Sequence, residues 1–343
     1  MQSELAIVIL NYNTCHLLNT YLPSVVKYSK GHRIIFVDNA SKDDSVNFIQ
    51  ENYPQIEVIQ LEENYGFTGG YNRALKQIDA KYYCLLNTDV EVTQGWIEPI
   101  INLMQSDEKI AVCQPKLLSY TEKNKFEYAG AAGGFIDYLG YPFCVGRIFD
   151  KIEEDKGQYD QIREIFWASG AAFFIKSELY HQFGGLDENY FAHFEEIDLC
   201  WRINARGREV AVVPQSVVYH LGGGTLSMQD ARKTYLNFRN NHLLLYKNLS
   251  LGRWVVLAFM RFFLDYLAAF MFLLKGKGAD AKAIAKARVD FLRMKKKVRP
   301  LRKKNMEHTI CPSIPMVYHG SLLVQYHLLR KSKFSQLRLS SKA

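Results

Sequence analysis

Residues 5–13 read LAIVILNYN, a run of six apolar residues that ends abruptly in a polar triplet. Such a run is typical of a strand buried on both faces of a parallel sheet. The pattern returns at residues 33–37, 57–61 and 82–86, with helical stretches between the apolar runs. This alternation predicts an α/β fold, in which helices flank a mixed, mostly parallel sheet with right-handed crossovers.

Asn or Asp follows each of these four runs. The residues concerned are 11–13 (NYN), 38–41 (DNAS), 62–64 (EEN) and 87–89 (NTD). Turns favour these residue types on their own. In parallel sheets, however, ligands bind beyond the carboxyl ends of the strands, where all four groups would meet. Four successive occurrences therefore predict a ligand site at this edge of the sheet.

Residues 191–202 read FAHFEEIDLCWR and place three carboxylates, Glu195, Glu196 and Asp198, in an otherwise largely aromatic and apolar run. Partial burial raises the pKa of a carboxylic acid toward neutral pH, which suits a general base. The alternative is an ordinary helix start, with acids near the N-terminus and Asp198 paired to Arg202 one turn later. These residues by themselves leave both interpretations open.

Five segments together resemble a known family. They are residues 37–41 (VDNAS), 64–72 (NYGFTGGYN), 86–90 (LNTDV), 169–171 (SGA) and 195–202 (EEIDLCWR). In this order they resemble the family 2 glycosyltransferases, in particular the rhamnosyltransferase-like branch that builds bacterial surface polysaccharides. The resemblance covers roughly residues 4–250. It implies a GT-A fold, a nucleotide-diphosphate sugar donor, a divalent metal and inversion at the anomeric carbon.

The same resemblance assigns a donor site. Asp38 would bind the nucleoside, with a helix cap as its alternative role. Asp89 ends the triplet that stands where the family has Asp-x-Asp, and it would be the main ligand of Mg²⁺ or Mn²⁺. His220, which precedes a glycine run at 222–224, resembles the second metal ligand, although a His without a ligand role is the alternative. Arg239 would neutralise the leaving diphosphate. Further residues expected at the nucleotide sugar are Asn11, Asn64, Gly69, Asn72 and Asn87.

The acceptor and the base are assigned in the same way. Small residues that leave room for a sugar follow an indole that offers a stacking face, so we expect the acceptor at Trp167, Ser169, Gly170 and Ala171. A tryptophan of the core is the alternative. Glu196 aligns with the family's base, and Glu195 is the second candidate because this chain has Glu where Asp is more usual. Glu196 would remove the acceptor proton while that oxygen displaces the nucleoside diphosphate.

The C-terminal third differs in composition, so we expect a catalytic domain at 1–250 and a helical, basic region at 251–343. Residues 254–274 are apolar except for Arg261 and Asp265, and they are long enough to cross a bilayer. The net charge of the chain is +8, and ten Lys or Arg residues lie between 286 and 304. Basic residues on both sides of the apolar stretch favour a helix that lies in the membrane interface. Residues 322–329 could add a second interfacial helix.

The expected partners are therefore an anionic membrane surface, at the cytoplasmic face of the inner membrane, and a glycan or lipid-linked glycan acceptor. Nucleic acid is not expected, because no recognition motif accompanies the basic residues. Six scattered cysteines favour a reducing compartment. The sequence leaves open the donor sugar and whether the chain forms a homo-oligomer.

Three alternative functions make different demands on the sequence. A sugar nucleotidyltransferase would need a Gly-rich loop with Arg and Lys after the first strand, where this chain has NYN at 11–13. A processive polysaccharide synthase would need a Gln-x-x-Arg-Trp motif and several spanning helices. A non-catalytic carbohydrate- or nucleotide-binding protein would not need nucleotide, metal and base motifs in order.

Overall fold

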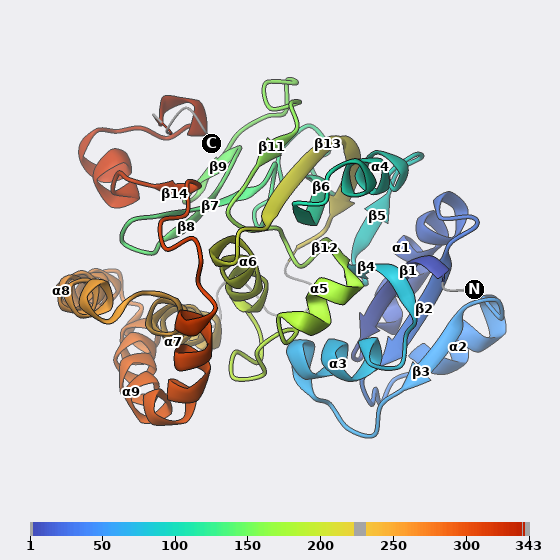
Figure 1. Cartoon of the computed structure of the whole chain (residues 1–343), viewed down its shortest axis with the longest axis horizontal. Coiled ribbons are helices and arrows are strands. Elements are labelled where there is room, and N and C mark those ends of the chain that lie inside the picture. Colours follow the sequence, from blue (N-terminus) through green and yellow to red (C-terminus); the bar gives the residue numbers. More distant parts are fainter. Residues whose placement is uncertain (1–2, 223–230, 338, 340–343) are drawn as a thin grey trace.

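The computed structural model describes residues 3–222, 231–337 and 339. Its N-terminal half is a parallel sheet built from the four expected strands (Figure 1). β1 pairs with β2 and β4, and β2 pairs with β3, all in parallel. The strands are β1 (Ser3–Asn11), β2 (Arg33–Asp38), β3 (Glu57–Gln60) and β4 (Ala80–Leu86), with α1 (Cys15–Tyr28), α2 (Ser45–Asn52) and α3 (Gly66–Leu75) between them. The prediction of an α/β fold is confirmed.

Side chains of β1 alternate between two apolar cores. Leu5, Ile7 and Ile9 belong to one buried cluster, whereas Ala6 and Val8 belong to the other. A strand with apolar residues on both faces must be covered on both faces, which explains why its sequence is continuously apolar. The sheet therefore sits between two layers of helices, and the carboxyl ends of its strands remain at the edge.

The sheet continues through strands from later in the chain. The order in the described residues is β11-β13-β6-β12-β4-β1-β2-β3, and β5 pairs with β13. β12 runs antiparallel between β4 and β6, so the residues just before it return to the end of β4. The added strands are β5 (Val90–Val92), β6 (Ile110–Ser119), β11 (Arg163–Glu164), β12 (Ala172–Lys176) and β13 (Glu209–His220). Helices α4 (Glu98–Ser106), α5 (Ser177–Gln182) and α6 (Glu195–Ala205) accompany them.

A second, smaller sheet has the order β10-β9-β8-β7-β14. Its strands are β7 (Gly134–Asp137), β8 (Pro142–Cys144), β9 (Arg147–Ile148), β10 (Lys151–Ile152) and β14 (Val317–Tyr318). β14 comes from the C-terminal region and pairs in parallel with β7. The end of the chain is thus attached to its middle.

Three long helices form the rest of the molecule: α7 (Ala231–Asn248), α8 (Leu251–Leu274) and α9 (Gly278–Glu307). They lie together at one end of the molecule (Figure 1). Of the three charged residues of α8, Arg261 and Asp265 point inward, whereas Arg253 near its start is exposed. Arg261 pairs with Asp265 at 3.0 Å, as their spacing allows, and donates to Asn241 of α7 at 2.6 Å. Asp265 also lies 2.9 Å from His242 of α7. These contacts fix which face of α8 turns outward.

The stretch 322–329 is helical over residues 322–328, with a π-helix at Val324–Leu328. Leu322 is buried, whereas Val324 and Leu328 are exposed. Its role as a second interfacial helix stays a prediction. The backbone N–H of Leu322 donates to Asp137 at 2.9 Å. The apolar residues here therefore serve partly to hold the C-terminal segment on the smaller sheet. A short 3-10 helix, Phe334–Gln336, follows.

Candidate active site

Asn11 and Asp38 meet at the carboxyl ends of β1 and β2, because the parallel register places them opposite each other. Asn11 Nδ2 donates to Asp38 Oδ1 at 3.1 Å and to Ser41 Oγ at 2.9 Å. The second carboxylate oxygen of Asp38 accepts from the Ser41 backbone N–H at 3.0 Å. Both Asn11 and Asp38 are buried. The structure brings these two candidate nucleoside residues together and fixes them in a rigid turn.

The loop before α3 is held against the end of β2 by Asn39, which the sequence analysis did not single out. The Asn39 amide donates to Asn64 Oδ1 at 3.0 Å and to the Gly66 carbonyl at 3.1 Å. It also accepts from the Tyr65 backbone N–H at 3.1 Å. Gly66 has φ +69°, and a Cβ there would stand 3.0 Å from the Phe191 ring. Glycine is needed here both for the backbone angle and for close approach to the segment that contains Phe191.

Gly69 and Asn72 lie further along α3. A Cβ at Gly69 would stand 2.8 Å from the Tyr65 Cβ, so close packing excludes a larger residue. Asn72 Nδ2 donates to the Leu186 carbonyl at 2.7 Å, and Asn72 Oδ1 accepts from the Tyr180 hydroxyl at 2.7 Å. Both residues therefore have a packing or hydrogen-bonding role in the free protein. Their contact with a donor stays a prediction.

Asp89 and His220 face each other beside the β5–β13 pair. His220 Nε2 lies 3.1 Å from Asp89 Oδ1. On the other side of the ring, Nδ1 lies 3.4 Å from Glu127 Oε1, an ion-pair contact without hydrogen-bond geometry. All three side chains are buried. Glu127 was not predicted, because nothing near it in the sequence marks it.

The charges of this cluster stabilise one another. Burial alone would lower the pKa of His220, but the hydrogen bond with Asp89 and the negative charges of Asp89 and Glu127 raise that pKa to about 10. Burial would likewise raise the pKa of Asp89, yet the contact with His220 outweighs it and the pKa is lowered. In the free protein the imidazole is therefore protonated and pairs with an ionised Asp89.

This pair fits Mg²⁺ or Mn²⁺. Neighbouring ligands of an octahedral ion at about 2.1 Å lie about 3 Å apart, and the two donor atoms stand 3.1 Å apart. Glu127 occupies the place of the carboxylate that orients a metal-bound imidazole. No group of three or more candidate ligands gathers among the residues the structure describes, so phosphate oxygens and water would supply the other positions. Gly223 and Gly224 of the expected glycine run lie outside the described residues.

The segment before the acidic pair is strained. Phe191, His193 and Phe194 have φ angles of +66°, +68° and +74°. Non-glycine residues with such angles persist only where the surroundings hold them, and they cluster at functional sites. Phe194 immediately precedes α6, so this backbone sets the direction in which Glu195 and Glu196 leave the helix start.

Two neighbouring residues of α7 hold this segment. Asn240 donates to the carbonyls of Tyr190, Ala192 and His193 at 3.2, 2.8 and 2.8 Å. Arg239 donates to the Tyr190 carbonyl at 2.8 Å. The predicted residue Arg239 thus lies against the segment that leads to the acidic pair. Asn240, which is fully buried, was missed as a positioning residue.

Glu195 and Glu196 are adjacent carboxylic acids with raised pKa values. Burial, followed by the charge of Glu196, raises the pKa of Glu195 well above its usual range. Burial raises the pKa of Glu196 to about 7. Oε2 of each is a buried atom without a hydrogen-bond partner in the described structure. By surface area, however, Glu195 is buried and Glu196 is only partly so, which makes Glu196 the more accessible of the two.

The small residues on the acceptor side lie beside the donor loop. Ser169 Oγ donates to the Ala129 carbonyl at 2.7 Å, and the Ala171 carbonyl accepts from the Asn87 backbone N–H at 3.0 Å. A Cβ at Gly170 would stand 3.4 Å from the Phe67 ring. Residues 169–171 therefore connect the end of β4, with Asn87, to the α3 loop.

Trp167 is a core residue in the free protein. Its side chain is 4% exposed, and Nε1 donates to the Phe135 carbonyl at 2.9 Å. A Cβ at Gly134 would stand 2.1 Å from the indole ring, so the ring lies directly on the backbone of β7. The face of the indole ring that was expected to stack on an acceptor sugar is therefore covered by protein. The position of Trp167 agrees with the alternative, a tryptophan of the core. Any contact with an acceptor stays a prediction.

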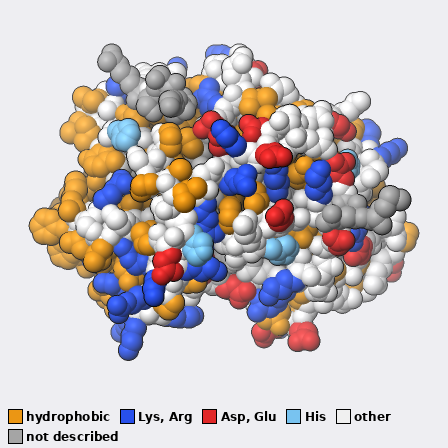
Figure 2. Space-filling view, viewed as in Figure 1, with side chains coloured by type: hydrophobic (Ala, Val, Ile, Leu, Met, Phe, Trp, Pro, Cys, Tyr) orange, Lys and Arg blue, Asp and Glu red, His pale blue; other side chains and the backbone are white. Residues whose placement is uncertain are grey.

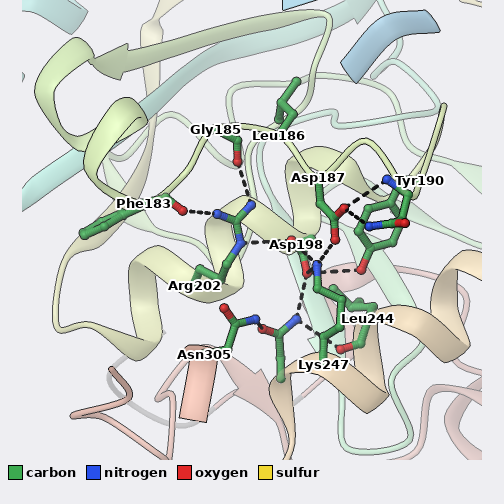
Figure 3. A network of polar contacts seen from close by, with 12 residues as sticks. Phe183, Gly185, Leu186, Asp187, Tyr190, Asp198, Arg202, Leu244, Lys247 and Asn305 are labelled. Carbon is green, nitrogen blue, oxygen red and sulfur yellow. Dashed lines mark hydrogen bonds and ion pairs between the residues drawn. The ribbon is translucent and has the colours of Figure 1, made fainter. Parts of the chain in front are cut away.

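Asp198 anchors α6 in a buried ionic network (Figure 3). Both carboxylate oxygens accept from Lys247 at 2.9 Å, and Arg202 Nε donates at 2.9 Å, the pairing allowed by their spacing. Asn248 donates to Asp198 at 2.9 Å, and Lys247 also pairs with Asp187. Burial would raise the pKa of Asp198, but Lys247 and Arg202 lower it to about 2. Asp198 is thus a charged anchor that ties α6 to α7.

Lys233 of α7 lies within electrostatic range of both Glu127, beside His220, and His193 of the strained segment. Burial, followed by the positive charge of Lys233, lowers the pKa of His193 to about 4. Burial lowers the pKa of Lys233, and the charge of Glu127 acts in the opposite direction. Glu127 and His193 therefore both lie within electrostatic range of one cation on α7.

Together, the strand-end Asn–Asp pair, the Asp–His pair and the high-pKa carboxylates on a mostly parallel sheet define a class: nucleotide-sugar-dependent glycosyltransferases of the GT-A fold. Residues 6–179 match the family described as Glycosyl transferase family 2. The chain belongs to that family, and it is a glycosyltransferase that uses nucleotide-sugar donors.

Two relatives and two solved structures illustrate the similarity. The low-salt glycan biosynthesis hexosyltransferase Agl10 of Haloferax volcanii is 22% identical over 251 residues, 71% of this chain and 76% of the relative. N-acetylglucosaminyl-diphospho-decaprenol L-rhamnosyltransferase of Mycobacterium tuberculosis is 23% identical over 237 residues, 64% of this chain and 76% of the relative.

TarS 1-349 of S. aureus, solved in complex with UDP, has a TM-score of 0.51 at 15% identity and covers 94% of this chain and 91% of its own. GalNAc-T7, solved with UDP, GalNAc and Mn²⁺, has a TM-score of 0.51 at 16% identity over 64% of this chain. The match spans only 43% of the GalNAc-T7 chain. These likenesses confirm the expected GT-A fold.

Proposed function

We propose that this glycosyltransferase is a metal-dependent, inverting enzyme that transfers a sugar from a nucleotide-diphosphate sugar to a hydroxyl of a glycan or lipid-linked glycan. One observation carries the proposal: Glu196, partly accessible at the start of α6, has a pKa raised to about 7 and a buried Oε2 without a partner. A carboxylate with a pKa near the working pH is suited to accept a proton from a hydroxyl.

Each side chain has one task in this mechanism. Asn11 and Asp38 would hold the nucleoside at the ends of β1 and β2. Asp89 and His220 would hold the divalent ion, which when bound neutralises the charge of the leaving diphosphate. Glu196 takes the proton of the acceptor hydroxyl while that oxygen bonds to C1 and the bond from C1 to the diphosphate oxygen breaks. A single displacement from the opposite face inverts the anomeric carbon.

Three further residues would support the base Glu196 and the departure of the diphosphate. Burial and the charge of Glu196 raise the pKa of Glu195 well above its usual range, and its side chain is the more buried of the two, so Glu196 is the better placed base. Arg239 would contribute positive charge near the leaving group. Asn240 would maintain the strained backbone that aims Glu196.

Membrane attachment is proposed through α8, and with it the division into a catalytic region, 1–250, and a membrane-associating region, 251–343. In the described part of the chain, α8 is the one helix long and apolar enough to cross a membrane. Its only charged pair, Arg261 and Asp265, is buried against α7. The opposite face exposes large apolar side chains, including Phe259 (68% exposed), Phe263 (57%) and Leu274 (66%). This one-sided pattern favours a helix lying in the interface.

The charge around α8 is consistent with that placement. Figure 2 shows apolar side chains gathered at the edge of the molecule where α8 lies, with Lys and Arg beside them over α9. Anionic headgroups attract such basic residues. The name of one relative gives an acceptor joined to decaprenol through a diphosphate, which agrees with an enzyme working at a membrane surface. The six cysteines are free, as suits the proposed cytoplasmic face.

Donor turnover tests this function directly. The protein would be incubated with a panel of UDP-, GDP- and dTDP-sugars, with Mn²⁺ or with EDTA, and nucleoside diphosphate release would be measured. We expect release with one class of donor in Mn²⁺ and its loss in EDTA and in Asp89→Ala. Thermal stabilisation by the matching nucleoside diphosphate should also require Mn²⁺. Full activity of the wild type in EDTA would contradict the metal assignment.

A further inference from the structure

A pocket of ≈ 600 Å³ opens between the first halves of α7 and α9. Four cations line it, and no acid is among the described residues that form its wall: Arg232 and Arg239 of α7, and Lys282 and Lys286 of α9. The Tyr235 ring lies beside two of these cations, with Lys286 Nζ 4.4 Å and the Arg239 guanidinium carbon 5.4 Å from the ring centre. This arrangement gathers like charges around one aromatic ring.

Nearby acids compensate this charge only in part. Lys286 pairs with Asp290 at 2.7 Å, but the Lys286 side chain is 67% exposed, so the pair is weak. Arg239 donates to neutral acceptors, the Asn240 side-chain oxygen and the Tyr190 carbonyl. Lys282 has no ion-pair partner among the residues that the structure describes. Arg239 and Lys282 therefore give the pocket positive charge that no acid among the described residues pairs with directly.

The pocket lies between the candidate active site and the apolar face of α8. Phe191, which contacts Gly66 of the donor loop, forms part of its wall. On the other side, Ala281 and Ile284 of α9 pack against Ala269 of α8. The next residue of α8, Phe270, is 54% exposed on the outer face. The pocket thus borders the segment that leads to Glu196 on one side and, through α9, a helix packed against α8 on the other.

We propose that this pocket binds the diphosphate of a lipid-linked glycosyl acceptor; the inference rests on the proposed function. A diphosphate carries several negative charges, and Arg can bind phosphate oxygens through two N–H groups at once. The first turn of α9, which also borders the pocket at Ala279, adds the positive end of a long helix. The acceptor sugar then extends past Phe191 toward Glu196, and the lipid chain extends toward the outer face of α8.

The test compares two soluble acceptors in the absence of vesicles: a short-chain lipid diphosphate sugar and the same sugar on a neutral alkyl chain. The variant Lys282→Glu/Lys286→Glu is compared with Lys296→Glu/Lys297→Glu, a matched charge change at two exposed positions of α9 outside the pocket. Charged hydrogen bonds predict that Lys282→Glu/Lys286→Glu loses about 10–100-fold in kcat/KM for the diphosphate acceptor. Its kcat/KM for the neutral acceptor should change less than twofold, and Lys296→Glu/Lys297→Glu should change neither.

A second arm distinguishes the acceptor from a membrane headgroup. Binding to vesicles with 30 mol% anionic lipid, on the order of a typical anionic leaflet, should be the same for Lys282→Glu/Lys286→Glu and for Lys296→Glu/Lys297→Glu. Equal losses on both acceptors, or a loss of vesicle binding with unchanged kcat/KM for the diphosphate acceptor, would overturn the proposal.

A third arm does not depend on turnover. Geranyl diphosphate is titrated calorimetrically in EDTA, so that no metal supports binding at the donor site. We expect binding to weaken at least about tenfold in Lys282→Glu/Lys286→Glu and to be retained in Lys296→Glu/Lys297→Glu. Equal binding by all three proteins overturns the pocket assignment. Absence of donor turnover by the wild type would instead count against the proposed function, which keeps the two failures distinct.

Discussion

Replacing Asp198 by Asn should destabilise the protein by about 3 kcal/mol at pH 7. The amide keeps the shape of the carboxylate but removes the charge that Lys247 and Arg202 surround at 2.9 Å. Lowering the Asp198 pKa from 3.8 to about 2 corresponds to about 2–3 kcal/mol in favour of the charged form. Breaking a buried ion pair typically costs about 3–5 kcal/mol. Lys247 retains Asp187, which places the expected value at the lower end of that range.

Urea unfolding followed by tryptophan fluorescence measures this cost. The control is Glu57→Gln, which removes an exposed ion pair with Arg33 and should cost about 0–1 kcal/mol. An Asp whose pKa is lower in the folded state stabilises the protein at pH values above its unfolded-state pKa. This stabilisation is lost as the pH falls toward the folded-state pKa. The difference between wild type and Asp198→Asn should therefore shrink by about 1 kcal/mol between pH 7 and pH 3. A cost below 1 kcal/mol at pH 7, or a difference independent of pH, would refute the reasoning.

Three other outcomes follow from the site and the helices. Because Glu196 must be deprotonated to act and its pKa is about 7, kcat/KM should rise about tenfold per pH unit below that value and level off above it; a flat profile from pH 5 to 8 would count against this base. In Phe259→Asp/Phe263→Asp the two changed positions are 68% and 57% exposed, so Tm should stay unchanged. Vesicle binding should fall more than about tenfold, because burial of each ring in the membrane interface would stabilise the bound state by about 1 kcal/mol. Unchanged sedimentation with vesicles would exclude α8 as the anchor. Asn240→Ala frees three carbonyls of the strained segment and should lower kcat about tenfold or more with little change in donor KM, whereas an unchanged kcat would assign Asn240 to stability alone.

Much of the sheet could be predicted because buried parallel strands are continuously apolar. The same pattern located Asn11 and Asp38, since the carboxyl ends of adjacent parallel strands must lie together. The smaller sheet could not be predicted. Strands such as Arg147–Ile148 and Lys151–Ile152 are too short for any periodicity, and Val317–Tyr318 joins β7 from far along the chain.

The supporting residues of the site escaped prediction for a related reason. Glu127 contacts His220 from 93 positions away, and Lys247 reaches Asp198 across 49 positions. Nothing local in the sequence marks such partners. Trp167 shows a different limit of prediction. An aromatic residue next to small residues occurs both in sugar-binding sites and in apolar cores, and only the packing of its ring on Gly134 distinguishes the two here.

The central claim is that Glu196 is the catalytic base, and the turnover number of Glu196→Gln measures it most directly. The amide keeps the size of the side chain but cannot accept a proton, so kcat should fall by about 10²–10⁴-fold while donor affinity stays nearly unchanged. Glu195→Gln, which changes the more buried of the two acids, should cost much less. If Glu196→Gln retains near wild-type turnover while Glu195→Gln abolishes it, the base is Glu195 and the assignment of Glu196 is contradicted.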